Sequence, residues 1–119
     1  MATRSTIRLQ NTLGVNTQIR IEQSVTLYKH WDGYPSNVKP LIELAVLNAN
    51  VNPKDRRFTS NVLAELIKLD DKIEITKSHE AHGDTEYQYN LNGEKLEIKQ
   101  YDFITGEYIN YTNNQIEVA

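Results

Sequence analysis

The chain turns from strand to helix within the segment Tyr28-Lys29-His30-Trp31-Asp32-Gly33-Tyr34-Pro35. Its Asp-Gly and Tyr-Pro pairs are typical of turns, and they interrupt the alternating pattern that precedes them. The segment, called the corner below, also holds the only Trp of the chain and one of its three His residues. Because loop side chains converge on binding sites more often than core side chains do, the corner is a candidate site as well as a turn.

Two alternating stretches before the corner predict a β-hairpin. Residues 3–9 alternate between polar and apolar, with Ile7 and Leu9 on the apolar face. A turn-rich link is expected over residues 11–16 and a second strand over residues 17–28. The hairpin should therefore bury an aliphatic face and expose a charged one.

Two helices are expected after the corner. The first should be capped by Ser36 or Asn37, hold Pro40 in its first turn, where a missing N–H is tolerated, and end at residues 48–50. The second should cover residues 54–69, because apolar residues recur there at helical spacing. These residues are Phe58, Val62, Leu66 and Leu69.

The C-terminal half is typical of a sheet. Strands are expected over residues 72–76, 86–91, 95–99 and 108–111, with a further short edge strand over residues 115–118. Asn92-Gly93 predicts a tight hairpin, because both central residues of a type I′ turn need a positive φ. Tyrosines in these strands should pack their rings and keep their hydroxyls in water.

The element order β-β-α-α-β-β-β-β predicts an α+β fold in which two helices cover one face of an antiparallel sheet. The 119 residues leave room for one domain, 1–119. A net charge of −3 with scattered Lys and Arg argues against a nucleic-acid partner. The absence of cysteine excludes a thiolate metal site and a Cys nucleophile. Without a signal peptide or a membrane-spanning stretch, a soluble cytoplasmic protein is expected.

The corner has the side chains of a ligand site. Trp31 and Tyr34 can stack on a flat ring, His30 and Asp32 supply a donor and an acceptor, and Gly33 lets backbone approach closely. They would suit a heterocyclic ligand such as a base or a nucleotide fragment. The alternative is a structural corner in which Trp31 caps the core.

Arginines on the polar face of the hairpin are candidates for an anion. Arg4 and Arg8 are an even number of residues apart and project to the same side, and Arg20 follows on the second strand. Such a face could hold phosphate through paired hydrogen bonds, with Arg4 favoured by its small polar neighbours. The alternative is an ordinary exposed strand in which Glu22 pairs with arginine.

The segment His79-Glu80-Ala81-His82 raises the question of a metal site. Its two histidines are three residues apart, whereas the helical metalloprotease pattern needs four, so a solvated loop is favoured. The chain also lacks a phosphate-binding glycine loop and an activated-serine elbow. We therefore assign no catalytic residue, no metal ligand and no cofactor. A small metal-dependent hydrolase using His30 and Asp32 is the least favoured alternative.

The N-terminal Met1-Ala2-Thr3-Arg4-Ser5-Thr6-Ile7, together with the corner, resembles a small-protein family of bacteriophages, prophages and some bacteria. Members begin with Ala- or Gly-Thr-Arg-Ser and present His-Trp-Asp-Gly-Tyr before a helix. The resemblance covers about the first third of the chain. It implies a phage origin, a location in the host cytoplasm, and a pocket shared by Arg4 and the corner residues.

Two functions follow as expectations. The first is a non-enzymatic binding protein with a site at Arg4, His30, Trp31, Asp32 and Tyr34, acting against host defence by sequestering a nucleotide-derived signal. The second is an interaction module, in which the Tyr-rich outer face of the sheet binds a host or phage protein or forms a homo-oligomer.

Overall fold

The computed structural model describes residues 3–14 and 20–111, without the side chains of residues 13, 14, 20 and 21. Within this part the elements follow one another as β-β-α-α-β-β-β-β, as expected, with one short 3₁₀ helix added. They are β1 (Ser5–Gly14), β2 (Arg20–Lys29), α1 (Pro35–Ala49), α2 (Phe58–Leu69), β3 (Glu74–Thr76), η1 (His79–Ala81), β4 (Tyr87–Asn92), β5 (Lys95–Asp102) and β6 (Glu107–Asn110). The edge strand expected over residues 115–118 lies outside the described residues.

The six strands form one mixed sheet in the order β3-β2-β1-β4-β5-β6, so they do not lie in the order of the chain. The prediction of an antiparallel sheet is wrong at its centre, where β4 runs parallel to β1, with Ile7 opposite Tyr89. The other neighbouring pairs are antiparallel. The cause is the link from β3 to β4, which passes over β2 and β1 through η1 instead of turning back, so β4 enters in the direction of β1.

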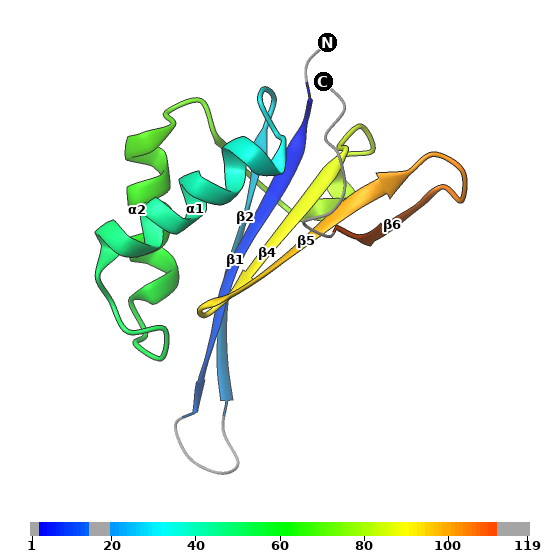
Figure 1. Ribbon diagram of the computed structural model, residues 1–119. Helices are drawn as coiled ribbons and strands as arrows, with labels where there is room; N and C mark the ends of the chain where they lie inside the picture. The colour runs from blue at the N-terminus through cyan, green and yellow to red at the C-terminus, as the bar shows by residue number, and fades with distance from the viewer. Residues whose placement is uncertain (1–2, 15–19, 112–119) are drawn as a thin grey trace.

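Both helices pack on one face of the sheet, as predicted (Figure 1). Alternate strand residues face them, including Ile7, Leu9, Leu27, Tyr89 and Leu91. Tyr87 and Tyr89 are 1% and 0% exposed, so these two rings belong to the core rather than to a wet outer face. In the described part the opposite face carries no α-helix, only the β3–β4 link with η1, and it is called the open face below.

The helix boundaries differ from the prediction. Helix α1 begins at Pro35, whose fixed φ suits a first helical position, and its N-cap residue Tyr34 makes no side-chain capping hydrogen bond. Pro40 therefore lies inside the helix rather than in its first turn, and the backbone hydrogen bond that its nitrogen would donate is missing. Helix α2 begins only at Phe58, because Asp55 and Arg57 form a turn before it.

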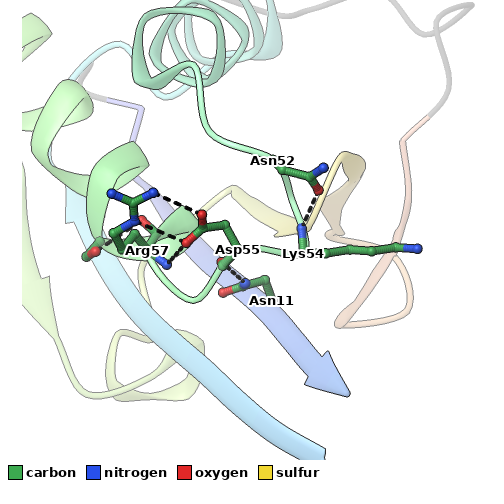
Figure 2. A network of polar contacts seen from close by, with 6 residues as sticks. Asn11, Asn52, Lys54, Asp55 and Arg57 are labelled. Carbon is green, nitrogen blue, oxygen red and sulfur yellow. Dashed lines mark hydrogen bonds and ion pairs between the residues drawn. The ribbon is translucent and has the colours of Figure 1, made fainter. Parts of the chain in front are cut away.

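A buried amide ties the α1–α2 connection to β1 (Figure 2). Asn11 is 1% exposed, and its Nδ2 donates to the backbone oxygens of Pro53 and Asp55 at 3.3 and 3.0 Å. Its Oδ1 accepts from the Thr59 hydroxyl at 2.6 Å. A buried polar side chain is tolerated when it is paired, so Asn11 can be part of the strand. The prediction that a link begins at residue 11 is therefore wrong, because β1 continues to Gly14.

Asp55 gives this connection a pH dependence. Arg57 donates to its carboxylate from the backbone N–H and from Nε and Nη2, at 2.9, 3.2 and 3.1 Å, and these hydrogen bonds lower the pKa of Asp55 to about 2 (Figure 2). A lowered carboxyl pKa stabilises the folded state above the unfolded value of 3.8, and the contribution is lost as the pH falls through the folded value. We expect Asp55→Asn to flatten the dependence of the urea midpoint on pH between about pH 4 and pH 2.

The control for this experiment is Asp71→Asn, because Asp71 is exposed and has no hydrogen bond or ion pair with the described residues. Its pH profile should follow that of the unmodified chain. Parallel profiles for all three proteins would show that the Arg57 contacts do not contribute to folding.

Candidate functional site

Three of the five predicted site residues line one depression. His30, Trp31 and Asp32 border a cavity of about 490 Å³ beside the end of α2. Its other lining residues are Lys29, Leu69, Asp70, Asp71 and Lys72. Trp31 is 59% exposed, so it does not cap the core and is available to a ligand at the rim of this corner depression.

His30 and Asp32 do not form a catalytic pair with each other. The His30 ring lies edge-on to Tyr28 at 4.5 Å, and its Nε2 is 3.5 Å from a carboxylate oxygen of Glu74. Asp32 is exposed and has a positive φ of 53°, and its backbone oxygen accepts a hydrogen bond from Asn37. The carboxylate that faces His30 is therefore Glu74, which the sequence did not indicate.

Tyr34 and Gly33 serve the packing of the corner. The Tyr34 ring is half-buried against Tyr87, with ring centres 6.1 Å apart. Gly33 N–H donates to the backbone oxygen of Thr3 at 2.9 Å, and the Tyr89 hydroxyl donates to the Gly33 oxygen at 2.6 Å. The close approach predicted at Gly33 exists, but the backbone that approaches is that of the N-terminal segment.

Arg4 lies near the corner without lining its depression. Its Nε is 3.3 Å from Asp84, and the Tyr28 hydroxyl donates to the same carboxylate at 3.1 Å. Burial and the bond to Asp84 raise the pKa of Tyr28. The Thr3–Gly33 hydrogen bond brings the two motifs together, but neither Arg4 nor Tyr34 shares the cavity of His30, Trp31 and Asp32.

A second cavity, of about 350 Å³, lies on the open face. We call it the open-face hollow. Its lining side chains come from β1, β2, β4, β5 and η1, and all of them are polar or charged: Arg8, Gln10, Glu22, His79, Gln88, Asn90, Glu97 and Lys99. Sequence reasoning singled out three of them: Arg8 as a candidate for an anion, Glu22 as its partner, and His79 in the metal-site question that was decided against. The side chain of Arg20 lies outside the described residues.

Two side chains that line the hollow each have a buried polar atom that the described residues leave without a partner. Arg8 lies directly opposite Asn90 in the parallel pair β1–β4. Arg8 Nη2 is 3.5 Å from Glu22, but Arg8 Nε and Asn90 Oδ1 are buried and make no hydrogen bond with the described chain. Leaving such an atom unpaired costs about 1–3 kcal/mol, so these two atoms lower the stability of the folded chain.

Within the described part, three further side chains in the hollow have no hydrogen bond or ion pair: Gln10, Gln88 and Lys99. They add amide donors and acceptors and one ammonium group. Arg8 and Lys99 are the basic residues of the site, and Glu22 and Glu97 supply its carboxylates. The arrangement can bind a polar ligand that offers both hydrogen-bond donors and acceptors.

The segment that carries η1 packs against the sheet, so the expectation of a solvated loop is corrected. His79 Nδ1 shares a hydrogen bond of 2.6 Å with the Thr6 hydroxyl, and the His82 ring stacks on Tyr28 at 3.8 Å. Burial lowers the pKa of His79; the charge of Glu80 opposes this shift, and the nearby Arg8 and Lys99 add to it. The lowered pKa favours the neutral form of the His79 imidazole at the border of the hollow.

The described residues contain no group of three or more His, Cys, Asp or Glu side chains that could hold a metal ion. Among the helices of the described chain, none has the length and apolar character needed to cross a membrane. Comparison with known proteins gave no matching family model, curated protein or solved structure.

Proposed function

We propose that this chain is a non-enzymatic protein that binds a small polar ligand in the open-face hollow. The observation that carries the proposal is that two residues of a cavity lined wholly by polar side chains, Arg8 and Asn90, each keep a buried atom, Nε and Oδ1, without a partner in the described chain. Both atoms are buried, so the ligand reaches them once the Asn90 amide turns or the Arg8 guanidinium moves away from Glu22.

The chemistry of the lining favours a nucleotide-derived ligand. Arg8 and Lys99 can hold a phosphate or pyrophosphate, and a guanidinium binds phosphate oxygens in pairs. The amides of Gln10, Gln88 and Asn90 offer donors and acceptors to the edge of a base, and the two carboxylates can accept from ribose hydroxyls. Sequestering a nucleotide-derived signal in the host cytoplasm, as a phage counter-defence protein, is the role we propose from this chemistry and the N-terminal resemblance.

A titration with cyclic nucleotides, cyclic dinucleotides and ADP-ribose derivatives tests the proposal. A compound that binds should raise the unfolding temperature, because a ligand at 100 times its dissociation constant stabilises by about 2.7 kcal/mol. It should also shift the imidazole NMR signals of His79, which borders the hollow. No shift with any of these compounds would contradict the nucleotide proposal.

Variants locate the site. Arg8→Gln should weaken binding by about 10- to 100-fold, because a hydrogen bond to a charged group contributes about 1.5–3 kcal/mol. The matched control is Arg4→Gln, which lies on the same face, pairs with Asp84 and stays outside the hollow. Trp31→Ala tests the corner depression separately. Loss of binding in Trp31→Ala, with Arg8→Gln unaffected, would place the ligand at the corner instead.

An interaction role is the second candidate. The described part exposes two neighbouring large apolar side chains, Phe103 at 79% and Ile104 at 94%. This interaction role does not rest on the Tyr-rich outer face that the sequence predicted, because Tyr87 and Tyr89 face the helices.

A further inference from the structure

The turn between β5 and β6 presents Phe103 and Ile104 at the tip of a hairpin that extends away from the helices (Figure 1). At 79% and 94% exposure they are the most exposed large apolar residues of the described part. Turns normally carry small or polar residues, so turn chemistry does not account for two bulky apolar side chains at this tip. We call this pair the knob.

The knob is held in place by its own turn. Asp102 Oδ1 accepts from Ile104 N–H at 3.0 Å, Asp102 Oδ2 accepts from the Thr105 hydroxyl at 3.0 Å, and Gly106 closes the turn with a φ of 73°. The ring of Tyr101 lies edge-on to Phe103 at 4.9 Å. An ordered turn loses little conformational entropy when its side chains are buried by a partner.

An apolar groove of about 370 Å³ lies between α1 and the β4–β5 hairpin. Its lining residues are Lys39, Ile42, Glu43, Val46, Leu47, Leu91, Glu94 and Leu96. Leu47 is 72% exposed there. The groove carries one cation, Lys39, and two carboxylates, Glu43 and Glu94. The acidic Asp102 and Glu107 flank the knob, so the net charges of the two surfaces do not attract and apolar burial would drive a contact between them.

We propose that the knob of one copy inserts into the groove of a second copy. The two surfaces lie at opposite ends of β5: Leu96 follows its first residue, and Phe103 follows its last. Seven steps along the chain separate Leu96 from Phe103, which is about 23 Å at about 3.3 Å per residue, so a knob does not reach its own groove. Each copy thus carries both halves of one contact, which makes the association heterologous, head to tail. The proposal is independent of the ligand hollow.

The contact is small, so it should be weak. Stable interfaces bury about 1,200–2,000 Å² in total, and one Phe side chain buries about 150–250 Å². We expect the average mass in sedimentation velocity to rise with concentration from the micromolar to the millimolar range. Sulfate, which strengthens apolar burial, should lower the concentration at which the rise begins.

Two variants distinguish this contact from other modes of association. The double variant Phe103→Ser/Ile104→Ser removes the knob and keeps the groove. Leu47→Glu places a charge in the apolar groove and keeps the knob. Each variant alone should stay monomeric. Mixed in equal amounts, they should form one-to-one dimers and nothing larger, because each then supplies one intact surface.

Leu44→Glu is the matched control: Leu44 is also on α1 and 43% exposed, but it does not line the groove. It should associate like the unmodified chain, and circular dichroism should show that every variant is folded. A chain that stays monomeric at millimolar concentration would overturn the proposal. So would a mixture that gives no dimer, or a Leu44→Glu variant that dissociates like Leu47→Glu.

Discussion

Replacing Gly33 with alanine is expected to lower the free energy of unfolding in urea by about 2–4 kcal/mol, the sum of overpacking and one weakened hydrogen bond. A Cβ at this position would lie 2.8 Å from the backbone oxygen of Thr3 and 2.9 Å from both Cβ and Oγ of Ser5. Backbone and a strand residue cannot swing aside as the end of a long side chain can. To make room, the corner must move away from the N-terminal segment, which stretches the 2.9 Å Gly33–Thr3 hydrogen bond.

Gly83→Ala is the control for this prediction. Nothing lies within 4 Å of a Cβ built at Gly83, so its stability should change by less than about 1 kcal/mol. Ser5→Ala should restore part of the loss in the Gly33→Ala background, because it removes one contact and a hydroxyl that has no hydrogen-bond partner within the described chain. If Gly33→Ala were as stable as Gly83→Ala, the close packing of the corner on Ser5 would be disproved.

Local pattern was enough to predict the elements but not their pairing. Alternation placed Ile7 and Leu9 on the core face, and helical spacing placed Phe58, Val62 and Leu66 there, because each pattern reflects burial of one face. The parallel pairing of β1 with β4 joins residues about 80 positions apart, and the sequence of neither strand indicates which strand lies beside it. The antiparallel prediction failed for this reason.

The same limit applies to the candidate site. The corner was visible because its rare side chains are consecutive, and three of them do border one depression. The open-face hollow needs the register of four strands, in which Arg8 lies opposite Asn90, Asn90 opposite Glu97, and β2 supplies Glu22 beside β1. Polar residues at alternate positions of β4 predict only an outward face, so a cavity shared with β1 and η1 could not be inferred from them.

Replacing Asp70 with alanine is expected to cost about 3–5 kcal/mol of stability, because removing one partner leaves a buried charge unpaired. Lys29, the last residue of β2, is 7% exposed, and its ammonium group bonds the Asp70 carboxylate at the end of α2. Burial alone would raise the pKa of Asp70, but hydrogen bonds from Lys29 and from the backbone of Lys72 outweigh it and hold that pKa below its ordinary value. Urea unfolding at neutral pH measures the loss.

The acid side of the same experiment tests the cause. Because the pKa of Asp70 is lowered in the folded state, the pair stabilises fully above the unfolded value of 3.8 and loses its contribution as the pH falls through the folded value. The stability difference between the unmodified chain and Asp70→Ala should therefore shrink below about pH 4.

Two further variants separate charge from packing at this site. Lys29→Met in the Asp70→Ala background should recover most of the loss, since burying an apolar side chain in place of an unpaired ammonium removes the penalty. Asp71→Ala, a neighbouring exposed carboxylate, should change stability by less than about 0.5 kcal/mol. If the double variant were no more stable than Asp70→Ala, the unpaired charge of Lys29 would not be the cause of the lost stability. The cause would then lie at the end of α2, where Asp70 Oδ1 accepts from Lys72 N–H.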